Sequence, residues 1–213
     1  VRVVDGLPSL SRRALLPILA AVLAPQGLDT PVFHTAFGPR PALAVEPSLE
    51  TFTGPDGFSW KTPASWGKPQ MQTLPDGRQL VVSVDPNDAD FNVFFASTPV
   101  QADYSSLGSF GNLDYVGGTF LPQCPVGQCT LERDGIAGRM ISQSASRGGY
   151  TFEYSIQQQG QPMRRLRTQM LLQTEEGRGK AIVTLTAQCT EGRVGELSPT
   201  LTAIIDSLAL PGK

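Results

Sequence analysis

The stretch "FNVFFASTPV" (Phe91–Val100) gives the clearest structural signal in this chain. It consists largely of aromatic and β-branched residues, which favour strands, and it is almost continuously apolar between Val93 and Ala96. A strand with one face in solvent alternates apolar and polar residues, whereas a strand covered on both faces does not. We therefore predict a strand that is buried on both faces of its sheet.

Six other segments carry strand signals, and short turn sequences such as "PDGR", "RGG" and "QGQP" separate several of them. Short turns join antiparallel neighbours, so we expect an antiparallel sheet of seven strands. The six segments are Phe58–Pro63, Gln79–Asp85, Gly138–Ser146, Tyr150–Gln158, Arg165–Gln173 and Ala181–Cys189.

Two helices are expected, one in the middle of the chain and one at its end. Asn112 is a suitable N-cap for the first, and its apolar face would hold Leu113, Val116 and Phe120 before it ends by Pro122. Glycine weakens a helix, so Gly117 and Gly118 indicate close packing against a neighbour.

The second helix is expected to begin with Ser198 as N-cap and Pro199 in its first position. An apolar stripe follows, made of Leu201, Ile204, Ile205 and Leu208. The element order is then β-β-β-α-β-β-β-β-α. Because a sheet of this size needs both apolar faces covered, the sequence predicts an α+β fold with a central antiparallel sheet between helical layers.

Composition and charge narrow the possible functions. The chain has 213 residues, of which 40% are apolar and 17% charged, and its net charge is −2. No clustered basic surface is apparent, so a nucleic acid is not expected as a partner. The 213 residues suggest one domain with an extension.

Residues 1–44 differ from the rest in charge. They carry four arginines against two aspartates, whereas residues 45–213 carry 13 basic and 17 acidic side chains. Arg12 and Arg13 precede an apolar run of 11 residues, too short to cross a bilayer, which takes about 20 residues. This layout is typical of an export signal of the twin-arginine kind. The alternative is a retained helix and extended arm that lies on a partner, and in both cases the domain proper is 45–213.

The single histidine, His34, lies in this N-terminal segment. Residues 45–213 therefore contain no imidazole for a Ser-His-Asp or Cys-His mechanism, and none to bind a metal. Nothing else in these residues supplies an activated nucleophile or an acid–base pair, so we expect a protein that is not an enzyme and that has no small-molecule substrate.

The glycine-rich stretch "YSSLGSFGNLDYVGG" (Tyr104–Gly118) follows the buried strand. It contains neither G-x-G-x-x-G nor the Gly-Lys-Ser/Thr of a phosphate-binding loop. It also lacks G-x-S-x-G, so Ser109 is not expected to be a nucleophile. We interpret the stretch as a connection between strand and helix, and consider Ser109 and Phe110 as candidates for docking to a partner.

Two charged clusters are further candidate sites. "DPNDAD" places Asp85, Asp88 and Asp90 close together in sequence, which has some features of a calcium loop but also of an ordinary turn. Arg164, Arg165 and Arg167 form the densest basic run, in which Arg165 and Arg167 share one face of a strand. They indicate either a solvated sheet face or a surface that docks on an acidic protein.

Three cysteines leave at least one thiol unpaired. Cys124 and Cys129 enclose the turn-forming "PVGQ", so together with the export signal they favour a Cys124–Cys129 disulfide, which suits an oxidising compartment. Because residues 45–213 offer three cysteines and no histidine, we do not expect a zinc site.

Several stretches resemble the PsbP-domain family of thylakoid-lumen proteins. They cover about residues 50–210 and include "GFSWKTPASW", "NVFFASTPV", "YSSLGSFGNLDYVGGTFLPQ", "RGGYTFEYSI", "RRLRTQMLL" and "LTAIIDSL". The resemblance implies an α/β/α sandwich, also seen in the Mog1 family, and a location in the chloroplast thylakoid lumen or its cyanobacterial counterpart.

The same resemblance implies an extrinsic, non-enzymatic protein peripheral to the membrane, with photosystem subunits as partners. Photosystem II on its oxygen-evolving side is the first expectation, with photosystem I or the chloroplast NDH complex as alternatives. Calcium is a candidate cofactor, but family metal binding relies partly on histidines that residues 45–213 lack. A small-ligand or enzymatic role on the same fold remains the alternative of another class, and the export signal argues against a Mog1-like binder of a small GTPase.

Overall fold

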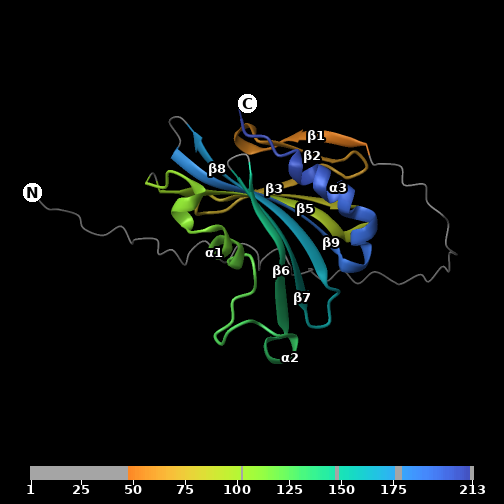
Figure 1. Ribbon diagram of the computed structural model, residues 1–213. Helices are drawn as coiled ribbons and strands as arrows, with labels where there is room; N and C mark the ends of the chain where they lie inside the picture. The colour runs from red at the N-terminus through yellow and green to blue at the C-terminus, as the bar shows by residue number, and fades with distance from the viewer. Residues whose placement is uncertain (1–47, 102, 147–148, 176–178, 212–213) are drawn as a thin grey trace, which may run out of the picture. The chain divides into compact units, whose positions relative to one another are not determined.

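The computed structural model describes residues 48–101, 103–146, 149–175 and 179–211 (Figure 1). The predicted targeting segment, 1–44, lies outside the described residues. The strands are β1 (Leu49–Thr53), β2 (Ser59–Pro63), β3 (Gln70–Thr73), β4 (Gln79–Asp85), β5 (Asp88–Val100), β6 (Ile136–Ser146), β7 (Gly149–Gln158), β8 (Arg164–Glu175) and β9 (Gly179–Thr190).

Helices are few and short. The α-helices are α1 (Leu113–Gly118), α2 (Leu131–Asp134) and α3 (Val194–Asp206), and the 3-10 helices are η2 (Pro55–Gly57), η3 (Leu107–Phe110) and η4 (Glu191–Arg193). Among the described helices, none has the length and apolar character needed to cross a membrane.

The main sheet has seven strands in the order β3-β4-β5-β9-β8-β7-β6, and all neighbours are antiparallel. After β5 the chain passes through α1 and α2 to the far edge of the sheet. The meander β6-β7-β8-β9 then returns strand by strand until β9 pairs with β5. β5 therefore holds the two halves of the sheet together.

The central strand is buried as its sequence predicts, because every residue from Phe91 to Ser97 is buried. One face of the sheet is covered by α3 and by the β1–β2 hairpin (Figure 1). There the Trp60 ring stacks on Phe95, with 4.8 Å between the ring centroids. The apolar stripe of α3 completes this core with Leu197, Leu201, Ile204 and Ile205, all buried.

α1 packs on the opposite face of the sheet, against β6 (Figure 1). A Cβ at Gly117 would collide with Gln143 Oε1 and lie only 3.1 Å from the Phe152 ring, so the predicted close packing is confirmed at this glycine. Gly118 has open space around its Cα, and the prediction is wrong there. Phe120 lies beyond the end of the helix, yet its ring still contacts Phe152, with 4.9 Å between centroids. The predicted α+β fold with helices on both faces of an antiparallel sheet is thus confirmed.

The strand count is right, but one strand was assigned to the wrong sheet. β2, predicted as part of the main sheet, pairs with β1 in a separate two-stranded sheet. The seventh strand of the main sheet is β3, whose sequence "QMQT" gives no strand signal. All four residues of β3 are exposed at the sheet edge, so no alternation of apolar and polar residues is required there.

The prediction for the start of α3 is also wrong. The helix begins at Val194 rather than at Pro199, which lies inside it. Proline removes the hydrogen bond from its own nitrogen to the carbonyl four residues earlier, here that of Gly195. Only one bond is lost near the N-terminal end, and η4 leads the chain directly into the helix.

Candidate functional site

The arginine cluster, defined as Arg164, Arg165 and Arg167 of β8, was the predicted docking surface. The alternation along β8 directs Arg164 to one face of the sheet and the other two to the opposite face. Arg164 Nη2 donates to Asp90 Oδ1 on β5 at 2.6 Å, and its Nε donates to the same oxygen at 3.1 Å. This guanidinium is already engaged within the protein.

Arg165 lies between two carboxylates. Its Nη1 donates to Glu153 Oε1 at 2.7 Å, its Nε donates to Glu191 Oε2 at 3.0 Å, and its Nη2 also bonds to Glu191. These hydrogen bonds, the one to Glu191 foremost, raise the pKa of Arg165. The bond from Arg165 in turn lowers the pKa of Glu191. The ion pairs tie β7 and η4, the turn that follows β9, to β8.

Arg167 reaches the helix above the sheet, because its Nη1 donates to the hydroxyl of Thr202 on α3. At the start of the same helix, Arg193 pairs with Asp88 and, at 3.1 Å, with Glu196. The arginine cluster therefore connects strands to each other and to α3 rather than presenting three unpaired cations.

The predicted metal ligands are each engaged with a different group. Asp90 pairs with Arg164, and Asp88 accepts from Arg193 and, at 3.0 Å, from the backbone N–H of Asp90. Asp85 accepts from the backbone N–H of Asn87 at 2.9 Å, which makes an ordinary turn. The structure does not bring these three carboxylates together as the ligands of one cation.

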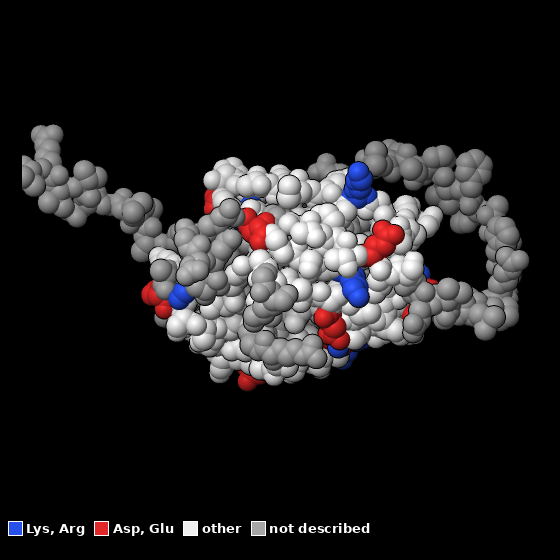
Figure 2. Space-filling model, turned by 90° about the horizontal axis from the view of Figure 1, so that it is seen from above, with Lys and Arg blue, Asp and Glu red and all other residues white. Residues whose placement is uncertain are grey.

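Charges on the face that carries β1, β2 and α3 are sparse. Figure 2 looks down on this face and shows acidic and basic side chains next to each other on a largely uncharged surface. A surface that docks through long-range electrostatics has a continuous patch of one sign. None is visible on the described part of this face.

The aromatic loop, defined as residues 103–115, contains Ser109 and Phe110, the other two predicted docking residues. The rings of Tyr104 and Phe110 stack with 4.1 Å between centroids and an angle of 6°. Lys180 Nζ donates to the backbone carbonyl of Tyr104 at 2.6 Å and fixes the start of the loop on β9. Ser109, at the centre of the loop, is exposed, and its hydroxyl accepts from the backbone N–H of Ser106 at 3.4 Å.

A glycine at the end of this loop sets the position of a third ring. Gly111 has φ of 135°, a conformation that other residues rarely adopt, and a Cβ there would collide with the Tyr115 ring. Tyr115 lies in the first turn of α1, and it is 61% exposed. The loop is thus an ordered connection that leaves an aromatic ring and several serines in solvent.

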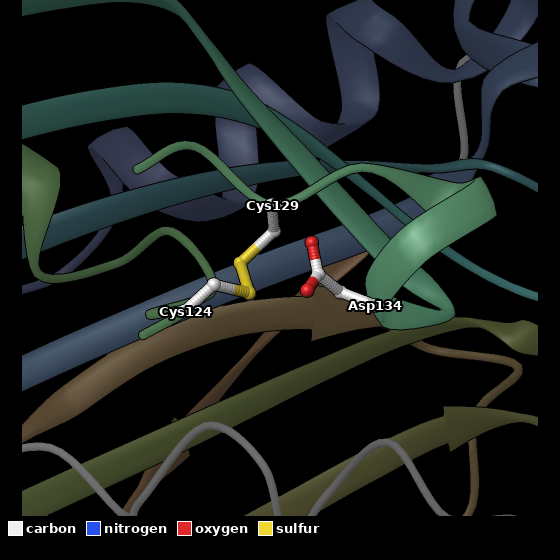
Figure 3. A group of neighbouring side chains, drawn as sticks. All are labelled: Cys124, Cys129 and Asp134. Atoms are coloured by element: carbon white, nitrogen blue, oxygen red, sulfur yellow. A yellow bond between two sulfur atoms is a disulfide. The ribbon is translucent and has the colours of Figure 1, made fainter. Parts of the chain in front are cut away.

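The predicted Cys124–Cys129 disulfide is present, in the loop that joins α1 to α2 (Figure 3). Cys189 is the free thiol, buried on β9, and burial raises its pKa to about 11. Such a thiol is protonated at neutral pH and is not a nucleophile.

A third side chain, which the sequence analysis missed, lies beside the disulfide. Figure 3 shows the Asp134 carboxylate of α2 next to the two sulfurs, and these ligand atoms all lie within 4.8 Å of one another. The sequence "TLERDG" does indicate a short helix at the position of α2. Thr130 is its N-cap and Gly135 ends it with φ of 67°. That Asp134 faces the cysteines could not be read from the spacing.

These features define a class of protein: an α+β domain with a seven-stranded antiparallel sheet, helices on both faces and an ordered aromatic loop. The chain belongs to the PsbP family, because a sequence model of that family matches residues 48–210. No curated protein sequence matches the chain.

Among the solved structures that match the chain are those of CyanoP and LpqN. The solution structure of cyanobacterial PsbP (CyanoP) from Synechocystis sp. PCC 6803 is 18% identical, with a TM-score of 0.54, and the match covers 82% of this chain and 98% of CyanoP. LpqN, involved in cell envelope biogenesis of Mycobacterium tuberculosis, is 11% identical with a TM-score of 0.37, over 76% of this chain and 90% of LpqN. At these identities, the likeness to CyanoP supports the fold.

Proposed function

We propose that this chain is an extrinsic, non-enzymatic protein of the thylakoid lumen that docks on a photosynthetic membrane complex and stabilises it or helps to assemble it. The observation that carries the proposal is the PsbP family match over residues 48–210. Photosystem II, on its oxygen-evolving side, is the first candidate partner, and photosystem I or the NDH complex are the alternatives.

The aromatic loop is the proposed docking surface. Exposed aromatic side chains bury a large area at a small cost in conformational entropy, and they are enriched in protein interfaces. Tyr115 is exposed, and Gly111 sets the backbone beneath it. Ser105, Ser106 and Ser109 of the same loop are exposed, and their hydroxyls can donate and accept hydrogen bonds.

The arginine cluster takes a structural role in this proposal. Its guanidinium groups bond to Asp90, Glu153, Glu191 and Thr202, so docking through them would require these internal bonds to break. No calcium is assigned to Asp85, Asp88 and Asp90, because their carboxylate oxygens do not gather at one point among the described residues.

A non-enzymatic role is supported by the chemistry of the side chains. Residues 45–213 contain no histidine, and the free thiol of Cys189 is buried with a raised pKa. A catalytic nucleophile needs the opposite environment, with a lowered pKa or an adjacent base.

One observation favours the alternative of a small-ligand protein. Asn92 Oδ1 and Gln188 Oε1 belong to cross-strand neighbours on β5 and β9, both are buried, and neither oxygen accepts a hydrogen bond. Buried acceptors without a donor are costly, and a bound water or a ligand hydroxyl would satisfy them. A thermal-shift screen of small polyols and amines with Gln188→Leu as control would test this alternative.

The docking proposal is tested with salt-washed thylakoid vesicles of both orientations. Inside-out vesicles expose the lumenal face, so we expect saturable binding of the purified full chain to these and none to right-side-out vesicles. Native gel electrophoresis after mild solubilisation then identifies the complex with which the chain migrates. Equal binding to both orientations, or a chain that stays in the soluble fraction, contradicts the proposal.

A further inference from the structure

The disulfide loop, defined as residues 124–134, brings two sulfurs and a carboxylate to one place (Figure 3). Cys124 Sγ, Cys129 Sγ and a carboxylate oxygen of Asp134 lie within 4.8 Å of one another. Thiolates and a carboxylate are ligands of thiophilic divalent cations, above all Zn²⁺. While the sulfurs are bonded to each other, they are unavailable as thiolates, so any such role belongs to the reduced protein.

The geometry of the loop does not depend on the disulfide alone. Arg133 Nη2 donates to the carbonyls of Val126 at 2.8 Å and of Gln128 at 2.7 Å, and both carbonyls lie between the two cysteines. The same nitrogen donates to Asp134 Oδ2 at 2.8 Å. Arg133 thus clamps the loop against α2. We expect this clamp to keep the two thiols near each other after reduction.

Asp134 is held in place by hydrogen bonds from two directions. Its Oδ2 accepts from the backbone N–H of Thr130 at 2.8 Å as well as from Arg133. Within the described residues, Oδ1 has a single donor, Arg133 Nε at 3.0 Å, so this oxygen is the one available to a cation.

We propose that the reduced protein binds one thiophilic divalent cation through Cys124, Cys129 and Asp134, and that the disulfide and the metal site are alternative states of one loop. A dithiol reductant supplies two electrons and two protons, cleaves the S–S bond and becomes a disulfide itself. Cation binding then forms two metal–sulfur bonds and one metal–oxygen bond, and each thiol releases its proton to solvent. A water molecule completes the tetrahedron.

The backbone spacing suits this exchange. Two sulfurs on one zinc ion lie about 3.8 Å apart, given zinc–sulfur bonds of about 2.3 Å. The Cα atoms of Cys124 and Cys129 are 5.5 Å apart, so rotation of the two side chains suffices to separate the sulfurs. Cys129 is buried and Cys124 is half-buried, so the reductant is expected to attack the Cys124 sulfur and release Cys129 as the first thiol.

The test uses the full chain, reduced with a phosphine that is then removed without oxygen, with three free thiols confirmed by titration. Cd²⁺ is the probe, because cadmium–thiolate bonds absorb in the near ultraviolet. We expect the absorbance to saturate at one Cd²⁺ per chain, Zn²⁺ to compete for the site, and two protons to be released per ion. The oxidised protein should give no such absorbance. A reduced protein with three free thiols and no saturable absorbance overturns the proposal.

Variants separate this site from non-specific binding. Cys124→Ser and Cys129→Ser should abolish the stoichiometric absorbance, whereas Cys189→Ser is the matched control and should leave it unchanged. Asp134→Asn should weaken binding at least tenfold without changing the absorbance per bound ion, and Asp134→Glu should restore part of the affinity. Circular dichroism of each variant confirms that it is folded. Unchanged binding by Cys124→Ser, or its loss in Cys189→Ser, refutes the assignment of the sulfurs. Wild-type affinity in a folded Asp134→Asn refutes the assignment of the carboxylate.

Discussion

The arginine cluster and the aromatic loop differ in where their interacting groups are directed. Arg164, Arg165 and Arg167 are charged and look like binding residues in the sequence, but all three bond to other parts of the protein. The aromatic loop is uncharged at its centre, yet it leaves the Tyr115 ring in solvent. A charged run can therefore be part of the architecture, while an aromatic ring on an ordered loop is available to a partner.

Stability and docking should therefore depend on different residues. Changes in the arginine cluster should lower the free energy of unfolding and leave docking intact in the folded protein. Changes in the exposed ring should do the reverse.

The largest expected effect on stability is that of Arg165→Ala. It leaves Glu153 and Glu191 facing each other without the cation between them. Because both carboxylates are partly exposed, we expect a loss of about 2 kcal/mol rather than the larger cost of a fully buried pair. Urea unfolding measures it. Arg78→Ala breaks the exposed pair with Asp76 and serves as control, with an expected change below about 0.5 kcal/mol. Equal losses in the two variants would contradict this account of the cluster.

Gly111→Ala should have the next largest effect. Alanine at this position would have to keep a backbone conformation that is unfavourable for it, and its Cβ would collide with the Tyr115 ring. We expect the free energy of unfolding to fall by about 1.5 kcal/mol. Gly108→Ala is the matched control in the same loop, because its Cβ would meet only Ser106 Oγ, at 3.5 Å. Thermal unfolding of the two variants gives the comparison. If both are as stable as the wild type, the aromatic loop is not held as described.

Thr202→Val tests the bond between the sheet and α3. It removes the hydroxyl that accepts from Arg167, whose Nε is already buried without a partner. We expect a loss of about 1 kcal/mol in urea unfolding, whereas Thr202→Ser, which keeps the hydroxyl, should lose less. A Val variant as stable as the Ser variant would mean that the Arg167 bond contributes nothing.

Acid should weaken the arginine cluster through Glu191. Its pKa is lowered in the folded state, so its contribution to stability is fully present above the unfolded pKa, about 4.3, and is lost as the pH falls through the folded pKa. Urea unfolding between about pH 5 and pH 3 should therefore show a shallower pH dependence for Glu191→Gln than for the wild type. An identical pH dependence of the unfolding free energy in the two proteins would show that Glu191 does not contribute to stability.

The fold could be predicted from the sequence wherever burial imposes a pattern. The apolar run of β5 and the stripe of α3 are read directly, because each must cover one or two faces of a core. β3 could not be read, since its residues are exposed on both faces. The start of α3 could not be read, because Ser198 and Pro199 have the sequence of a first turn although Pro199 lies inside the helix.

The ion pairs of Arg165 and the group around the disulfide were harder to predict, because their members are distant in the sequence or face each other only in the folded chain. Arg165 lies diagonally opposite Glu153 and Glu191, and that arrangement follows only once the register of β7, β8 and β9 is known. Asp134 reaches the cysteines because α2 turns the chain back on the loop. Sequence spacing records the pair Cys124–Cys129, but not the carboxylate beside it.

The most direct test of the central claim is the affinity of Tyr115→Ala for inside-out thylakoid vesicles, measured beside Thr202→Val. Truncating an exposed interface ring costs about 1.4 kcal/mol or more, which is a factor of ten in the dissociation constant. We expect Tyr115→Ala to bind at least tenfold more weakly at wild-type stability, and Thr202→Val to bind like the wild type despite its lower stability. Wild-type affinity in Tyr115→Ala would contradict the assignment of docking to the aromatic loop, and weakened binding by folded Thr202→Val would contradict the separation of docking from stability.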